Sequence, residues 1–386
     1  MPKVGSTKPD RSFLGGKKVV KVACIQAPQI VFNKEKSIEV ACKKIKEAGA
    51  NGAELVAFSE SYIPVYANYY NPGFHNIPSE MTRWITGLYD NSIVIPSDDT
   101  DRIAKACKDA GVYCVMGVNE LDDDETSRTM YNTQIIFGAD GTILGRHRKI
   151  KPTHAERVFW GEGDGSDLGV YKTSIGRIGS LVCWEHHTTV IKVAQMLMGE
   201  EFHIANWPGT YSFKDPNIAT VGVTDPHKND GITAAREYAF EAGCFVLSVH
   251  GLLREEDFEP EYKDLINSKD VNFDYANGGS CVINPFGDII AGPVYNEDTI
   301  IYADCYADEI KCAKLFFDGM GHYSKPSVAK VLLNTEHQTN LNIINSDTDV
   351  VKSAPDYKYL KQLSEEFEIK MARLEKLAEK IETSNK

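Results

Sequence analysis

Three side chains that could form a nucleophilic site each follow an apolar, strand-like run. Glu60 ends the run ELVAFSE, Lys149 follows a predicted hairpin, and Cys183 closes the run IGSLVC. Ligands of open α/β sheets bind beyond the carboxyl ends of the strands, so these are positions where chemistry is expected. A thiol has an ordinary pKa of about 8.5 and needs a base or a neighbouring cation to react as a thiolate at neutral pH. Glu60 could accept its proton, and Lys149 could stabilise negative charge.

Each of these residues also has a purely structural interpretation. A cysteine at a strand end is commonly a small buried core residue. Lys149 belongs to the basic run RHRK, which could be a solvated face, and Glu60 could simply begin a loop. The residue types alone therefore leave this group a hypothesis.

Other reactive side chains lie nearby in the sequence. His186 and His187 follow Cys183 closely, which leaves open a Cys–His pair or a metal-ligand set. A dense group of tyrosines follows Glu60, and it could line an apolar pocket or pack within a loop. The tyrosines of this group are Tyr62, Tyr66, Tyr69 and Tyr70.

The elements that must position these residues occur in the same order in both halves of the chain. Hydrophobic periodicity and glycine stops predict strand, helix, strand, helix, strand and hairpin twice. The first set covers 19–27, 38–48 (a helix stopped by Gly49 and Asn51–Gly52), 54–60, 103–110, 112–118 and 131–146; the second covers 178–185, 189–198, 201–207, 232–242, 244–251 and 278–293. We therefore expect a duplicated α/β unit, with two mixed sheets facing each other and helices outside.

The chain is expected to hold one large domain between two extensions. Residues 1–17 carry no periodic pattern and predict a flexible lead-in, residues 18–330 form the α/β domain, and residues 331–386 form a C-terminal extension. The extension contains about three heptads, which suit either a short coiled coil between subunits or one amphipathic helix docked on its own domain. The heptad positions are Leu360, Leu363, Phe367, Leu374, Leu377 and Ile381.

Composition excludes several classes of protein. Hydrophobic residues at 42% and charged residues at 25% are ordinary for a globular chain. The net charge of −13 argues against a nucleic-acid partner. The nine cysteines are odd in number and form no CxxC pair, which argues against a disulfide framework or a zinc site. The sequence has neither an apolar run long enough to span a membrane nor a signal peptide, so a cytoplasmic location is expected.

Several strings around the three residues resemble those of the carbon–nitrogen hydrolase superfamily, also called the nitrilase superfamily. They are FSES around Glu60, RHRKIKPTHAER around Lys149 and LVCWEH around Cys183. The continuation RKIKPTHAERVFWGEGDGSDL is similar to the nitrilase branch, as are HIANWPG, GGSCVINPFGDIIAGP and GMGHYSKP. The resemblance covers residues from about 20 to 326.

The resemblance implies an αββα four-layer sandwich, here with a C-terminal helical tail. It implies Cys183 as the nucleophile, Glu60 as the general base, Lys149 as the charge-stabilising residue, and Glu156 as a second glutamate that orients the lysine and the substrate. It implies no metal and no organic cofactor. It also implies a homo-oligomer, at least a dimer and in some relatives a spiral or filament.

The implied activity is that of a nitrilase, which hydrolyses a small organic nitrile to a carboxylic acid and ammonia through a thioimidate and a thioester. Trp184, Tyr66 and His187 are candidate substrate contacts. The same catalytic residues also suit an amidase, a carbamoyl-amine hydrolase or a cyanide hydratase, and a non-catalytic assembly protein is a further alternative. The run 187–189 reads His-Thr-Thr where nitrilases commonly have a Pro-Leu step, so the substrate class is the open question.

Overall fold

The chain divides into two compact units, Met1–His337 and Gln338–Lys386, in the computed structural model. The structure describes residues 11–71, 79–124, 127–209, 230–266, 272–273, 276–338 and 365–376. Within the second unit, residues 365–376 form a helix on which Phe367 and Leu374 are exposed. The other heptad positions (Leu360, Leu363, Leu377 and Ile381) and residues 1–10 of the expected lead-in lie outside the described residues.

The first sheet of the large unit has the order β15-β1-β2-β4-β5-β6. Its strands are β1 (Val19–Gln26), β2 (Leu55–Ala57), β4 (Tyr113–Leu121), β5 (Met130–Phe137), β6 (Ile143–Arg148) and β15 (Thr299–Tyr306). Helices α1 (Lys34–Ala50) and α3 (Asp98–Ala110) connect the parallel strands β1, β2 and β4. The antiparallel β15 returns from the end of the domain to pair with β1.

The second sheet repeats this plan in the order β11-β13-β10-β9-β8-β7, with β14 paired to β13. Its strands are β7 (Val170–Thr173), β8 (Gly176–Val182), β9 (Phe202–Trp207), β10 (Phe245–His250), β11 (Leu252–Leu253), β13 (Ala276–Ile283) and β14 (Ile289–Tyr295). Helices α4 (Thr189–Leu197) and α5 (Asp230–Ala242) lie between the parallel strands β8, β9 and β10. The remaining elements are α2 (Ser79–Asp90), α6 (Lys263–Ile266), α7 (Ala307–Phe316), β3 (Tyr70–Asn71), β12 (Asn272–Phe273) and the short 3-10 turns η1 (Leu14–Gly16), η2 (Ala67–Tyr69), η3 (His154–Val158), η4 (Cys183–His187), η5 (Glu255–Asp257) and η6 (Pro260–Tyr262).

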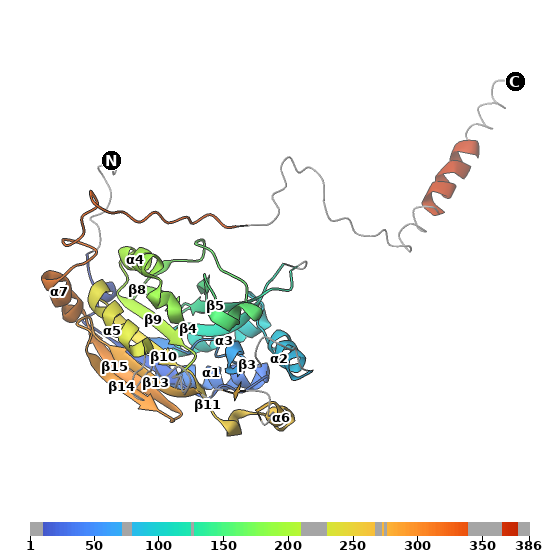
Figure 1. Cartoon of the computed structure of the whole chain (residues 1–386). Coiled ribbons are helices and arrows are strands. Elements are labelled where there is room, and N and C mark those ends of the chain that lie inside the picture. Colours follow the sequence, from blue (N-terminus) through green and yellow to red (C-terminus); the bar gives the residue numbers. More distant parts are fainter. Residues whose placement is uncertain are drawn as a thin grey trace, which may run out of the picture. The chain divides into compact units, whose positions relative to one another are not determined.

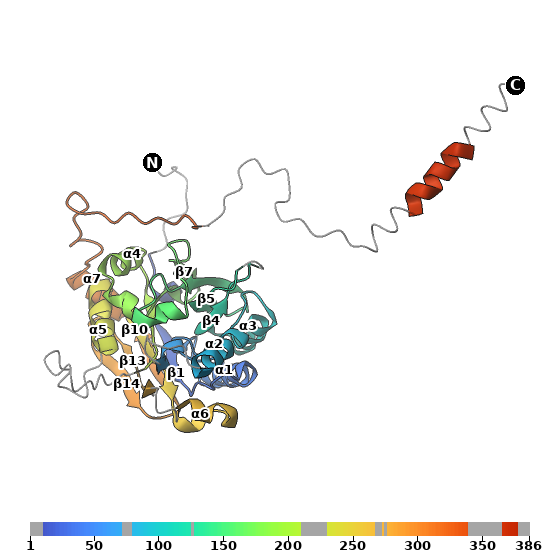
Figure 2. The same ribbon diagram turned by 45° about the vertical axis from the view of Figure 1, so that its right-hand side comes forward.

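The two sheets pack face to face with helices on their outer sides (Figures 1 and 2). Between the sheets, residues such as Val22 and Leu55 of the first sheet share a core with Ile204 and Leu247 of the second. A second core joins the first sheet to α1 and α3, and a third joins the second sheet to α4 and α5. Parallel strands covered on both faces are buried along most of their length rather than at alternate residues, as β1 and β9 are. The predicted αββα sandwich is thereby confirmed.

The carboxyl end of α1 has a packing role. Helix α1 ends at Ala50 and is capped by Asn51, within the predicted stop at Gly49 and Asn51–Gly52. Gly49 faces α3 and lets the two helices approach closely. A Cβ atom on Gly49 would lie 2.9 Å from the Cβ of Ala110. Near the amino terminus, Leu14 of the expected lead-in is buried within η1. Across the described part of the chain, no helix is long and apolar enough to cross a membrane.

Candidate active site

Glu60 lies just beyond β2 and is held between the two sheets. The chain from Ser59 to Ser61 passes directly over Gly117 of β4, where any Cβ atom would overlap the carbonyl oxygen of Ser59. The backbone N–H of Glu60 donates to the carbonyl of Trp207 in the second sheet, at 3.4 Å. Only glycine at position 117 leaves room for the backbone that carries the Glu60 carboxylate.

Lys149 extends β6 and turns its ammonium into the protein. Its backbone N–H donates to the carbonyl of Asn132, which continues the β5–β6 ladder by one residue. The fully buried Nζ lies 3.0 Å from Oε1 of Glu60 and 2.7 Å from Oε2 of Glu156. Glu156 is fixed in turn by the hydroxyl of Tyr66, which donates to its Oε1 at 2.5 Å, and by the N–H of Thr153.

Cys183 follows β8 of the second sheet and begins the turn η4. Its φ is +51°, in the left-handed region that residues other than glycine rarely adopt. The side chain is only 5% exposed. The Sγ of Cys183 and carboxylate oxygens of Glu60 and Glu156 lie within 4.8 Å of one another. The structure therefore brings all four residues of the expected catalytic group together, although they come from both sheets.

A thiolate and two carboxylates are of the type that could bind a metal ion, but this group already contains a cation. The Lys149 ammonium donates to Glu60 and to both oxygens of Glu156 at 2.7–3.0 Å. An ammonium in these contacts neutralises the buried negative charge that a metal would otherwise have to balance. The donor set thus suits an amine-assisted thiol site.

The buried environment sets the protonation states of the group. Burial raises the pKa of Glu60 to about 7, although the Lys149 ammonium opposes this. Burial and the nearby Glu60 carboxylate also raise the pKa of the Cys183 thiol well above its usual value. Burial lowers the pKa of Lys149, but Glu156 and Glu60 outweigh it, so the net shift is upward. The resting site therefore holds a neutral thiol, a charged amine and a base suited to neutral pH.

One oxygen of the base is available to take a proton. Oε1 of Glu60 accepts from Lys149 and, at 2.6 Å, from the side-chain amide of Asn132. Among the described residues, Oε2 of Glu60 has no hydrogen-bond partner. A buried acceptor without a partner is costly unless a ligand or a reaction uses it. Oε2 is thus the atom expected to receive the thiol proton.

This arrangement predicts the pH dependence of turnover. Glu60 acts as a base only when it is deprotonated, so kcat/KM should rise with pH, pass half its maximum near 7 and be lost as pH falls below that value. The Asn132 hydrogen bond lowers the pKa of Glu60, so Asn132→Ala should move this limb to higher pH. A pH–rate profile from pH 5 to 9 measures both. A flat profile across neutrality would contradict the role of Glu60.

The three candidate substrate contacts have different surroundings. The hydroxyl of Tyr66 bonds Glu156, so we interpret Tyr66 as a residue that positions the catalytic group. Trp184 is 37% exposed, and its indole N–H donates to Asp230 at 3.0 Å. His187 is exposed beside the same Asp230, with 3.9 Å between Nε2 and Oδ2. Trp184 and His187 therefore form a polar and aromatic surface next to the nucleophile.

The alternative of a Cys–His pair is not supported by the contacts of His186. Nδ1 of His186 lies 2.6 Å from the backbone carbonyl of Cys183, and Nε2 lies 2.9 Å from Nε2 of His203. A nitrogen that faces a carbonyl oxygen must carry the proton, so Nδ1 donates. Burial and the neighbouring His203 lower the pKa of His186 well below its usual value. His186 is thus a neutral residue that holds the backbone carbonyl of Cys183.

Two residues of the site were missed by sequence reasoning. Asn132 binds Glu60, and Glu185 accepts from the N–H groups of Val182 and Ile150 at 2.7 and 2.8 Å. The available signal was a run of polar residues (Asn132, Thr133 and Gln134) inside a predicted strand for Asn132, and a carboxylate two residues after Cys183 for Glu185. Neither signal identifies a partner without the packing of the two sheets.

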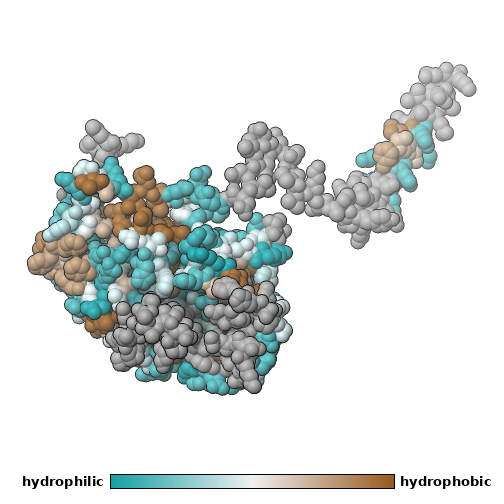
Figure 3. All heavy atoms as spheres, viewed as in Figure 1, coloured by the Kyte–Doolittle hydropathy of each residue, from teal (hydrophilic) through white to brown (hydrophobic). Residues whose placement is uncertain are grey.

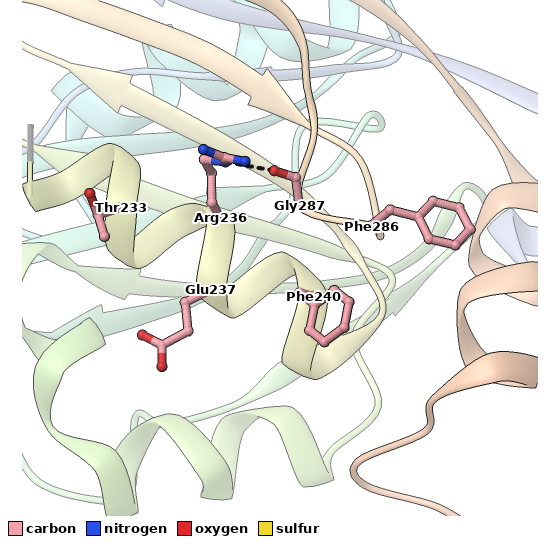
Figure 4. Close-up of a pocket in the computed structure, with 6 residues that line it drawn as sticks. All are labelled: Thr233, Arg236, Glu237, Phe240, Phe286 and Gly287. Carbon is pink, nitrogen blue, oxygen red and sulfur yellow. Dashed lines mark hydrogen bonds between the residues drawn. The ribbon is translucent and has the colours of Figure 1, made fainter.

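A separate hollow of about 380 Å³ lies on the outer side of the second sheet, shown in Figure 4. It lies between α5 and the β13–β14 hairpin, where the side chain of Arg236 donates to the carbonyl of Gly287 at 2.7 Å. Its lining residues are Thr233, Arg236, Glu237, Phe240, Phe286 and Gly287. It shares no residue with the catalytic group.

Comparison with known proteins agrees with this geometry. The family model described as carbon-nitrogen hydrolase matches residues 21–314. The chain is 35% identical to an aliphatic nitrilase of Rhodococcus rhodochrous, covering 83% of this chain and 84% of that one. It is 32% identical to a bifunctional nitrilase/nitrile hydratase of Lupinus angustifolius, covering 83% and 87%. A carbon-nitrogen hydrolase from Helicobacter pylori has a similar fold, with a TM-score of 0.61 at 16% identity over 79% of this chain and 95% of that one. The chain therefore belongs to the carbon–nitrogen hydrolase family, and within it to the nitrilase branch.

Proposed function

We propose that the protein hydrolyses a small organic nitrile to the carboxylic acid and ammonia, with Cys183 as nucleophile. The observation that carries this proposal is the buried group of thiol, carboxylate and ammonium at the carboxyl ends of β2 and β8. The similarity to an aliphatic nitrilase favours nitriles over other carbon–nitrogen substrates. The roles of the individual residues follow from their contacts.

The first half of the reaction forms a carbon–sulfur bond. Glu60 takes the thiol proton of Cys183 as sulfur attacks the nitrile carbon, and the proton passes to the nitrogen to give a thioimidate. The Lys149 ammonium stabilises the charge that develops on nitrogen. The backbone N–H of Trp184, in the first turn of η4, is a second candidate donor, because such groups lack an acceptor within the turn.

The second half consumes two molecules of water. Water activated by Glu60 adds to the thioimidate, and the tetrahedral adduct expels ammonia to leave a thioester on Cys183. A second water, activated in the same way, cleaves the thioester to the acid and restores the thiol. Expulsion of the thiolate instead of ammonia would release an amide. An amide substrate would enter at the tetrahedral stage, which makes amide hydrolysis the nearest alternative for the same residues.

Ammonia release from matched substrates tests the proposal. Aliphatic and aromatic nitriles, their amides and a carbamoylated amine should be compared at equal concentration. We expect nitriles to be hydrolysed fastest, to yield mainly acid with some amide, and to leave an acyl or thioimidate adduct on Cys183 in the quenched enzyme. Fast hydrolysis of amides with inert nitriles would reject the nitrile substrate while retaining the hydrolase chemistry.

We further propose that the chain assembles at least into a homodimer. Large apolar side chains stay exposed on α4 and α7, and Figure 3 shows apolar spheres gathered where Figure 1 places these helices. They are Val190, Leu197, Leu315 and Phe316, and Phe240 of α5 is also half-exposed. Exposed apolar patches of this kind are typical of protein interfaces. Light scattering measures the mass in solution and so tests this proposal. The spiral assembly, the coiled coil of the C-terminal extension and the cytoplasmic location remain predictions.

A further inference from the structure

A single buried carboxylate contacts the backbone beside both the nucleophile and the catalytic lysine. Glu185 is 2% exposed and lies in η4. Its Oε2 accepts from the N–H of Val182 at 2.7 Å, and its Oε1 accepts from the N–H of Ile150 at 2.8 Å. Val182 directly precedes Cys183, and Ile150 directly follows Lys149. One side chain thus joins the end of β8 in the second sheet to the end of β6 in the first.

A third contact fixes the charge of this carboxylate. Nε2 of His147 lies 2.8 Å from Oε2 of Glu185, and both side chains are buried. Burial raises the pKa of Glu185, but His147 and the two backbone donors outweigh it, so the pKa falls. Burial lowers the pKa of His147, but Glu185 and Asp167 outweigh it, so the pKa rises. Charge-assisted hydrogen bonds to an ionised carboxylate are stronger than neutral ones.

A contact that joins the two sheets would keep Cys183 at a fixed distance from Glu60 and Lys149. Glu60 and Lys149 belong to the first sheet and Cys183 belongs to the second, so their separation depends on contacts that cross between the sheets. Cys183 also holds a left-handed backbone, with φ at +51°. A conformation of that kind persists only where surrounding contacts determine it.

We infer that Glu185 is a positioning residue that sets the distance between the Cys183 thiol and the Lys149 ammonium. The inference rests on the proposed roles of these two residues. Both carboxylate oxygens of Glu185 already have partners in the flanking backbone and in His147, so it acts through geometry rather than by touching the substrate. A displacement of about 1 Å at a reacting group costs about 100-fold in rate.

The variant Glu185→Gln tests the inference at constant side-chain size. A glutamine has one acceptor oxygen, so its NH₂ group must face the N–H of Val182 or of Ile150, and one anchor is lost. We expect kcat to fall about 100-fold while KM changes less than about threefold. We also expect iodoacetamide to modify Cys183 about tenfold more slowly, because the thiol moves away from its base and cation. Mass spectrometry can measure this rate against the exposed Cys312 in the same molecule.

The matched control is Glu201→Gln. Glu201 is a buried glutamate that also accepts from a backbone N–H, that of Leu14, and from Arg177, but it lies outside the catalytic group. It should keep the wild-type kcat and the wild-type alkylation rate. An equal loss of kcat in both variants would overturn the inference, because it would show a general effect of removing a buried carboxylate.

A second variant keeps the test valid if Glu185→Gln fails to fold. Glu185→Asp retains the charge but is one methylene shorter, so it cannot reach both backbone donors, and kcat should fall about tenfold. Wild-type kcat and alkylation in either folded variant would overturn the inference. Alkylation requires no substrate, so it still reports on Glu185 if nitriles prove inert. Failure of the proposed function would instead appear in the wild-type enzyme.

Discussion

Replacement of Cys183 by alanine is expected to lower the turnover of any nitrile or amide by at least about 10⁴-fold. The thiol forms the only covalent bond to the substrate in the proposed reaction, so the remaining Glu60 and Lys149 cannot compensate. Ammonia release measures the loss. In the wild-type enzyme, mass spectrometry after quenching should show an adduct on Cys183, and the variant should show none.

The fold should survive this change, which makes the loss interpretable. Cys183 is a small side chain at a strand end. The local backbone is held by the N–H of Val182, which donates to Glu185, and by the carbonyl of Cys183, which faces Nδ1 of His186, and neither contact involves sulfur. The matched control is Cys114→Ala, which removes a fully buried thiol from the core between the first sheet and α3. It should retain turnover despite a similar loss of packing. Substantial activity in a folded Cys183→Ala protein would contradict the proposed mechanism.

The central strands and their helices could be predicted because the parallel strands of both sheets are buried on two faces. Mainly apolar segments such as β9 and β10, separated by glycine-terminated helices, leave few alternatives. The edges could not be predicted in the same way. Strand β15 has only two buried residues, Ile301 and Cys305, and α7 buries only Ile310 and Ala313. Strand β15 owes its structure to pairing with β1, far away in the sequence, rather than to a local pattern.

The same distinction holds at the site. Glu60, Lys149 and Cys183 could be proposed from the sequence because strand ends are where α/β folds place reactive groups, and the resemblance added Glu156. Asn132 could not, because its role exists only once the end of β2 lies across β5. The protonation states were equally hidden, since the pKa of Glu60 near 7 results from burial between two sheets. The contact of Asn132 and the protonation state of Glu60 therefore follow from the packing of the two sheets and not from the local sequence.

Replacement of Lys149 by methionine is expected to lower kcat by about 10³-fold, because the developing charge on the substrate nitrogen loses its nearest cation. Methionine preserves the length and the apolar stem of the side chain. The change also leaves Glu60 and Glu156 facing each other without a counter-charge. Since the Lys149 ammonium holds the pKa of Glu60 down, the acid limb of the pH–rate profile should move above neutrality.

The cost in stability must be separated from the cost in catalysis. Loss of one partner from a buried ion pair destabilises a fold by about 3–5 kcal/mol, so the thermal midpoint of Lys149→Met should fall. The control Lys192→Met also removes a buried ammonium. Lys192 lies on α4, and its Nζ is 2.8 Å from the carboxylate of Glu241 on α5. It should lose stability but keep kcat and the wild-type pH profile. If Lys149→Met kept wild-type turnover, or if both variants lost kcat equally, charge stabilisation by Lys149 would be refuted.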